Sequence, residues 1–177
     1  MRRLTRTVLA LLALLQIALP AGARETNVME GINLAVIMPV DLSASPGNAE
    51  CGLTEGLIID AIREPVLAEG LLTEHFVQAK PFMIDTPGVY LIPTIATLRG
   101  AASGSGSSVC TSWIGLRAQS AHTLVLPSTG QRKTVQILYW DRGILISGPL
   151  SNHAGAATAA LRQLGTAFGE QWRSDQR

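Results

Sequence analysis

The sequence predicts an α+β fold in two layers, a mainly antiparallel sheet with helices packed on one face. Apolar residues alternate with period two near the N-terminus and again over consecutive segments of the second half, which is typical of strands. Two other segments repeat apolar residues at helical spacing. The expected order is strand, helix, three or four strands, helix. Strands that follow one another without helices between them favour an antiparallel meander.

The first 23 residues have the three parts of a secretory signal peptide. Three arginines form a basic start, Val8–Leu19 is apolar apart from Gln16, and Ala21–Ala23 is a small-residue cleavage site. A helix that crosses a membrane needs about 20 apolar residues, and this stretch is shorter. We therefore expect residues 1–23 to be removed, residues 24–177 to form a single domain, and no membrane anchor to remain.

Cys51 and Cys110 are the two cysteines of the chain. An exported protein folds in an oxidising compartment, which favours a disulfide between them. Closing a loop of about 60 residues stabilises a fold by roughly 4 kcal/mol in the chain-entropy model. Neither a C-x-x-C motif nor paired histidines indicate zinc. We expect a Cys51–Cys110 disulfide, no metal, and a periplasmic or secreted protein.

The charge argues against nucleic acid as a partner. The chain has 14 basic and 13 acidic residues, and the first 23 residues hold three of the basic ones. The mature chain therefore lacks the basic excess of nucleic-acid binders. Acidic residues concentrate before position 99 and basic residues after it. This asymmetry indicates either a bipolar surface for a charged partner or acidic helix faces that interleave with basic strands in the fold.

In the first half, Ile32–Asp41 is the expected strand, with its even-numbered apolar residues on one face. A loop over Leu42–Glu50 follows, and then a helix with apolar positions over Leu53–Val66. Pro65 is expected to kink this helix or to start a new turn, and Gly70 to end it. A cysteine at the start of this helix and one on the inner face of a central strand would tie the helix to the sheet.

The second half contains four expected strands: Val89–Leu98, Val109–Ala118, Thr134–Trp140 and Ile144–Gly148. Pro93 places the first of these at a sheet edge or a bulge. Small residues make Arg99–Ser108 a loop, polar residues make Ser128–Lys133 turn-like, and Asp141–Gly143 is typical of a tight hairpin turn. A short additional strand is allowed at Phe82–Ile84.

The C-terminal segment predicts a long helix. Ser151 or Asn152 can cap its N-terminus. One apolar stripe runs along it: Ala157, Leu161, Leu164, Phe168 and Trp172. We expect this stripe to face the sheet, with Trp172 as an anchor for the helix.

Side chains suited to catalysis are few. His75, His122 and His153 lack metal or catalytic spacing, and we expect surface or capping positions for them. Asp60 and Glu64 lie one helical turn apart, which is typical of a solvated helix face, whereas a glycosidase places its two carboxylates across a cleft. We predict no catalytic residue, no metal site and no cofactor.

Two other features have both a functional and a simpler interpretation. The run Ser103–Ser108 lacks the G-x-S-x-G of a nucleophile elbow and the Lys-Ser/Thr of a phosphate loop, so we expect a flexible, exposed loop. Trp140 could form a stacking platform for a sugar or a peptide, and Trp113 could pair with it across neighbouring strands. Packing in the core or at an edge is the simpler interpretation of both tryptophans.

These observations favour a non-enzymatic accessory or binding module of the cell envelope, whose partner is a protein or an envelope component. Its candidate contact surfaces are the Ser/Gly loop, the Asp141–Gly143 turn and any uncovered sheet face near Trp113 and Trp140. Two alternatives stay open. One is a hydrolase in which a serine, a histidine and an acid converge from distant positions, and the other is an assembly subunit with a large exposed apolar patch.

Overall fold

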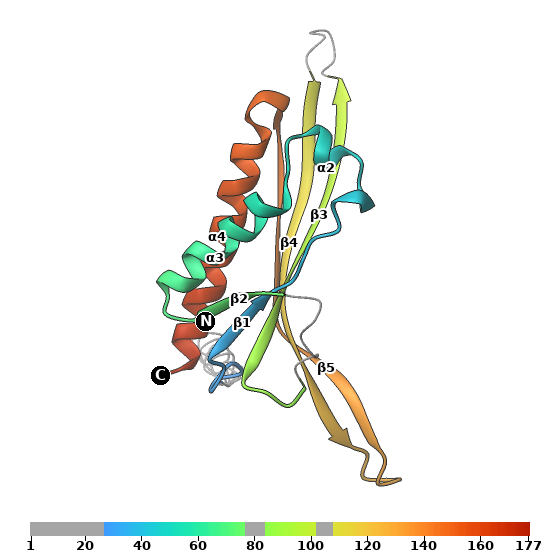
Figure 1. Cartoon of the computed structure of the whole chain (residues 1–177), viewed down its shortest axis with the longest axis vertical. Helices are drawn as coiled ribbons and strands as arrows, with labels where there is room; N and C mark the ends of the chain where they lie inside the picture. Colours follow the sequence, from blue (N-terminus) through green and yellow to red (C-terminus); the bar gives the residue numbers. More distant parts are fainter. Residues whose placement is uncertain (1–26, 77–83, 102–107) are drawn as a thin grey trace, which may run out of the picture.

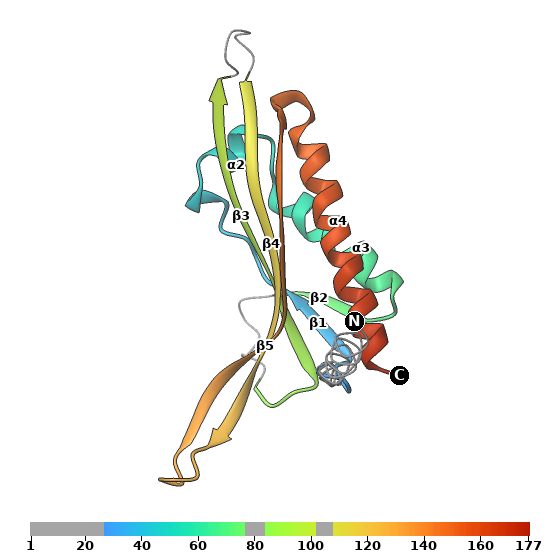
Figure 2. The same ribbon diagram turned by 180° about the vertical axis from the view of Figure 1, so that it is seen from behind.

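The computed structural model describes residues 27–76, 84–101 and 108–177, so the predicted signal peptide lies outside it. Within these residues, five strands form a mixed sheet in the order β2-β1-β3-β4-β5, and helices pack on it (Figures 1 and 2). The elements are β1 (Leu34–Ile37), η1 (Leu42–Ala44), α2 (Gly47–Glu50), α3 (Glu55–Ala68), β2 (Leu72–His75), β3 (Gly88–Ala101), β4 (Ser108–Val125), β5 (Arg132–Pro149) and α4 (Leu150–Asp175). The predicted α+β class is confirmed.

The sheet has a parallel and an antiparallel part. β1 pairs in parallel with β2 on one side and with β3 on the other, whereas β3, β4 and β5 pair in antiparallel fashion. The sequence did not predict β2, because Leu72–His75 has no alternation of apolar and polar residues. The long helix ends before Gly70, as expected. Gly70 then turns the chain with a φ of +97°, which glycine adopts without strain, and β2 returns beside β1.

β1 is shorter than predicted, and its odd-numbered residues face the helices. Ala35 and Ile37 belong to the core between sheet and helices. Val36 is also buried but lies on the opposite face of the strand. A strand that is buried on both faces carries apolar residues on both, so alternation alone does not identify the inner face.

β5 is one strand rather than two, so the predicted turn at Asp141–Gly143 is wrong. Gly143 pairs with Gly115 in the middle of the β4–β5 ladder. A Cβ on Gly143 would overlap the six-membered ring of Trp113, so this glycine permits close packing rather than a turn.

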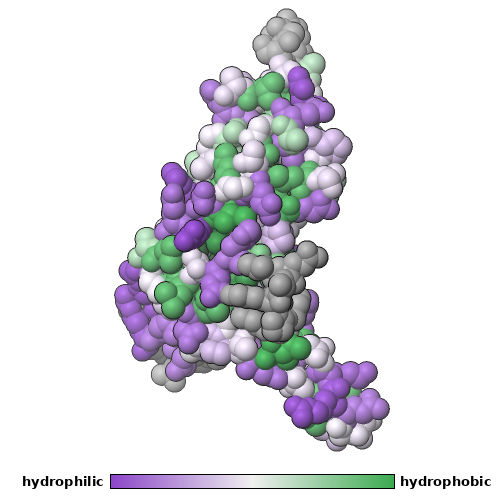
Figure 3. All heavy atoms as spheres, in the orientation of Figure 1, coloured by the Kyte–Doolittle hydropathy of each residue, from purple (hydrophilic) through white to green (hydrophobic). Residues whose placement is uncertain are grey.

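The β4–β5 hairpin continues beyond the rest of the sheet. A β-bulge at Ala118/Gln119 marks the change. Beyond it, the two strands extend away from the helices as a two-stranded arm (Figures 1 and 2). The arm closes in a turn that contains Gly130 at a φ of +67°. Its end is mainly hydrophilic (Figure 3).

α3 and α4 lie side by side on one face of the sheet (Figures 1 and 2). The α4 stripe is buried as predicted at four positions: Ala157, Leu161, Leu164 and Phe168. Trp172 is partly buried, and its Nε1 donates a hydrogen bond of 2.7 Å to the carbonyl oxygen of Ile32. The predicted cap is wrong, because α4 begins at Leu150 and includes Ser151 and Asn152 in its first turn without a side-chain cap.

The contact between the two long helices depends on a glycine. A Cβ on Gly165 of α4 would lie 2.8 Å from Cγ of Pro65 and 3.0 Å from the carbonyl oxygen of Ile62. Pro65 lies inside α3, and the helix continues past it to Ala68. The proline ring therefore takes part in the helix–helix contact.

The upper edge of β3 is covered by short elements. β1 ends before β3 reaches Pro93, so β3 is an edge strand there, as the proline predicted. Ser45 then donates a hydrogen bond of 2.7 Å to the carbonyl oxygen of Thr97, and Asn48 Nδ2 donates one of 3.3 Å to that of Ile95. These side chains replace a neighbouring strand.

A disulfide joins Cys51 and Cys110, with an S–S distance of 2.03 Å and a Cα–Cα distance of 6.2 Å. Cys110 is buried on the helix side of β4. Cys51 follows the short helix α2 instead of starting the long helix. The disulfide therefore ties the α2–α3 connection, rather than α3 itself, to the sheet.

We expect Gly165→Ala to lower the free energy of unfolding by about 1–3 kcal/mol, because the added methyl group has no space between the helices. Gly155→Ala is the matched control on the same helix. A Cβ there meets no atom within 4 Å, so it should stabilise by about 0.5–1 kcal/mol through helix propensity. Urea unfolding measures both, and equal effects would contradict the tight helix contact.

Replacing both cysteines by alanine should cost about 2–4 kcal/mol, because the disulfide limits the unfolded chain across a separation of 59 residues. Urea unfolding of the oxidised protein, the reduced protein and the double variant provides the comparison. The last two should agree. Unfolding of all three at the same urea concentration would show that the disulfide carries no stability.

Candidate functional site

A buried chain of polar side chains links α4 to the sheet. His153 Nε2 lies 2.7 Å from Ser112 Oγ, which lies 2.6 Å from Thr97 Oγ1. All three residues are almost completely buried. The surface or capping position predicted for His153 is therefore wrong. It lies one turn before Ala157 on the buried stripe, which starts earlier than the apolar pattern indicated.

This chain does not form a catalytic triad. His153 Nδ1 is buried and has no hydrogen-bond partner among the described residues, so no acid orients the ring. Burial also lowers the pKa of His153, which keeps the imidazole neutral. The three side chains hold α4 against β3 and β4.

A second cluster brings a serine, a histidine and an acid together at the base of the arm. Ser120 Oγ lies 2.6 Å from His122 Nε2 and 2.9 Å from the hydroxyl of Tyr139, which is 3.0 Å from the same nitrogen. Asp85 Oδ1 lies 3.7 Å from His122 Nδ1. These are the residue types that the hydrolase alternative required.

The geometry of this cluster fits a structural role, in which the hydrogen bonds stabilise the base of the arm, better than a catalytic role with Ser120 as the nucleophile. The carboxylate of Asp85 accepts a 2.8 Å hydrogen bond from the Thr123 backbone amide, which lowers the pKa of Asp85, and 3.7 Å is too long for a hydrogen bond to His122. Ser120 is buried and pairs with Ile137 in the β4–β5 ladder. A nucleophile elbow instead exposes its serine at a sharp turn beside free backbone amides.

The face of the sheet opposite α3 and α4, here called the outer face, carries exposed apolar side chains. Leu98 is 76% exposed, Leu145 67% and Trp113 48%. Strand pairing arranges this face in four neighbouring rows: Leu98, Thr111 and Ser147; Ala96, Trp113 and Leu145; Thr94, Gly115 and Gly143; Ile92, Arg117 and Asp141. The row of Trp113 and Leu145 thus carries large apolar side chains, and the next row contains two glycines, Gly115 and Gly143, which have no side chain.

A hollow of about 80 Å³ lies on the outer face beside Trp113. We call it the tryptophan hollow, and its lining is Thr94, Trp113, Gly115, Leu116, Arg117 and Asp141. The Trp113 ring lies across Gly143, next to the floor at Gly115. Arg117 and Asp141 lie beyond the floor as an ion pair, with Nε 3.4 Å from Oδ2.

The two tryptophans that the sequence singled out lie on opposite faces. Trp140 pairs with Ala118, is buried in the core, and makes an edge-to-face contact with Phe168 at 5.7 Å. It therefore neither pairs with Trp113 nor forms an exposed platform. Trp113 occupies the exposed position predicted for an uncovered sheet face.

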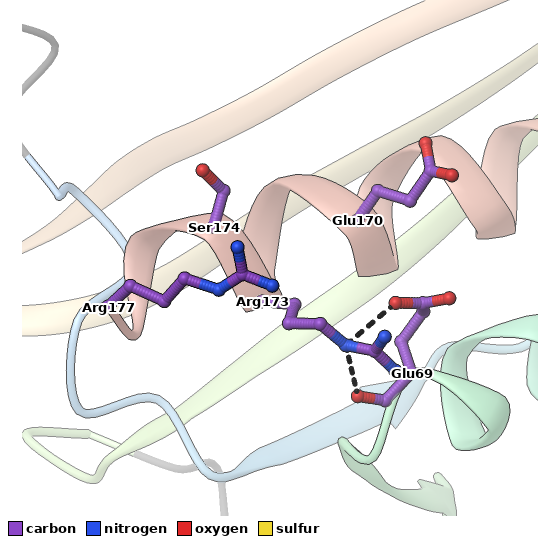
Figure 4. Close-up of a pocket in the computed structure, with 5 residues that line it drawn as sticks. All are labelled: Glu69, Glu170, Arg173, Ser174 and Arg177. Carbon is purple, nitrogen blue, oxygen red and sulfur yellow. Dashed lines mark hydrogen bonds and ion pairs between the residues drawn. The ribbon is translucent and has the colours of Figure 1, made fainter.

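A larger hollow of about 270 Å³ lies at the C-terminal end of α4 (Figure 4). Its central side chain is already engaged. Arg173 Nε lies 2.9 Å from Glu69 Oε2 and donates to the Glu69 carbonyl oxygen, while Nη2 donates to that of Ala68. Arg173 thus fastens the end of α3 to α4, where a cation favourably meets the helix C-terminus.

The remaining predicted residues lie apart from the tryptophan hollow. His75 is exposed on β2, and Asp60 is exposed on α3, as is Glu64, which pairs with Arg162 at 2.7 Å. The Ser/Gly loop falls largely outside the described residues. Within the part of the chain that the structure describes, no cluster of three potential metal ligands occurs, and no helix is long and apolar enough to cross a membrane.

Comparison with known proteins adds a distant structural likeness. No protein-family model and no curated protein sequence match the chain. The solved structure of a PelC dodecamer from Paraburkholderia phytofirmans, a variant with one substitution, is similar over 78% of this chain and 87% of that one, with 14% sequence identity and a TM-score of 0.39. A likeness at this level carries no argument about function.

We expect the burial of His153 to lower the free energy of unfolding as the pH falls. Its pKa in the folded protein lies below the ordinary value of 6.5, so as the pH drops through 6.5 the unfolded chain takes up the proton first. The free energy of unfolding should therefore decrease below that pH, until His153 protonates in the folded state as well.

His153→Gln should flatten this dependence, whereas His75→Gln, at an exposed position, should leave it unchanged. Urea unfolding at several pH values between about 5 and 7.5 measures the slope. An identical slope in wild type and His153→Gln would contradict the role of the buried imidazole.

Proposed function

We propose that the protein is an exported, non-enzymatic binding module of the cell envelope that contacts an envelope component through its outer face. The observation that carries the proposal is that helices cover only one of the two faces of the sheet. Helices bury one face, whereas Leu98, Trp113 and Leu145 stand exposed together on the other. A soluble protein rarely leaves large apolar groups clustered in this way without a use for them.

The surroundings of these side chains fit a contact surface. Arg117 and Asp141 border them at one end, and both are about half exposed. Apolar centres flanked by polar groups are the usual composition of binding surfaces. The signal-like N-terminal segment and the Cys51–Cys110 disulfide support export, because disulfides persist in oxidising compartments.

The hydrolase alternative is supported by the Ser120–His122 contact alone. Turnover of a small activated ester that is lost in Ser120→Ala would favour it over a binding module. An assembly subunit is the other alternative, and light scattering on the purified protein with and without Leu145→Ser would detect self-association through the outer face.

The outer face is tested by co-sedimentation with isolated envelope fragments. We expect Leu98→Ser/Leu145→Ser to reduce the bound fraction several-fold, because both side chains would be buried by the partner. Leu124→Ser/Leu138→Ser is the matched control. It removes two leucines of the arm that are 51% and 55% exposed, and it should bind like wild type. Equal retention of both double variants would refute the outer face as the contact.

A further inference from the structure

We propose that the tryptophan hollow binds a neutral saccharide unit, an inference that rests on the outer face being the contact surface. The ligand class follows from three properties of the hollow: a half-exposed indole, a floor without side chains, and a charged pair whose charges cancel. Each property excludes some ligands, and a neutral sugar ring meets all three.

The floor leaves the indole accessible. Gly115 and Gly143 pair side by side on β4 and β5, and Gly143 must lack a side chain for the Trp113 ring to lie across it. A Cβ on Gly115 would lie 3.6 Å from the indole Nε1, so this edge of the ring faces the floor of the hollow. The indole N–H can therefore donate a hydrogen bond to a hydroxyl of a sugar that lies on this floor, while the apolar part of the ring remains available to the C–H groups of the sugar.

The charged pair favours a neutral, polar ligand. Arg117 supplies donors, Asp141 supplies acceptors, and their opposite charges leave no net charge to attract an ion. A purely apolar ligand would remove water from this pair without replacing its hydrogen bonds, which is costly. Sugar hydroxyls both donate and accept, so they can bond to each partner. Thr94 lies on the same lining.

The backbone of the floor is less suited to a peptide strand. Gly115 lies between Thr94 of β3 and Gly143 of β5, so the ladder on both sides of β4 occupies its backbone groups. Peptides that add to a sheet do so at an edge, where main-chain groups are free. Recognition in the hollow must therefore come from side chains.

The test is an NMR titration of the mature protein, following the Trp113 indole N–H signal, assigned with Trp113→Phe. The probes are neutral oligosaccharides of glucose and of N-acetylglucosamine, with oligogalacturonate and chitosan oligomers as anionic and cationic counterparts. We expect at least one neutral oligosaccharide to shift this signal. Gly115→Ala should weaken its binding about tenfold, because the methyl group fills the floor at ordinary contact distances.

Gly100→Ala on β3 is the matched control, since it adds the same methyl group on the same outer face of the sheet, in open space, and should bind like wild type. The proposal is overturned if no neutral oligosaccharide shifts the signal, if Gly115→Ala binds normally, or if only the charged oligomers bind. In those cases the proposed function still stands when Leu98→Ser/Leu145→Ser reduces envelope retention, and it fails independently when that retention is unchanged.

Discussion

The close packing of α4 against α3 and the inner face of the sheet determines which surface the protein presents. Gly165 brings the two helices together at Pro65, and the chain His153–Ser112–Thr97 attaches α4 to the strands. Both helices are thereby held on one side. On the opposite face, Leu98, Trp113 and Leu145 remain exposed to solvent and are available for binding.

The sequence predicted the α+β class and the α4 stripe because both depend on apolar spacing, which the chain carries directly. It missed β2 because Leu72–His75 lacks apolar alternation, and it split β5 because glycine has two uses that sequence alone does not separate. Gly70 permits a backbone conformation with positive φ, whereas Gly143 makes room for a ring from the neighbouring strand. The second use depends on a residue 30 positions away, Trp113, and on strand register.

The candidate site was only partly predictable for the same reason. An uncovered sheet face near a tryptophan was expected, yet alternation does not reveal which tryptophan faces the helices. Trp140 meets Phe168 in the core, and Trp113 lies outside. His153 was missed because the buried stripe of α4 includes one polar residue, whose hydrogen bond to Ser112 compensates for part of its burial.

Because the Trp113 ring occupies the space that a side chain at position 143 would need, the residues at these two positions constrain each other in evolution. A homologue that keeps the indole must retain glycine at the facing position, whereas one that carries a small residue in place of the indole is free to accept any side chain there. The two positions should therefore change together among homologues. The residue at position 143 then indicates whether a homologue has kept an aromatic ring at position 113.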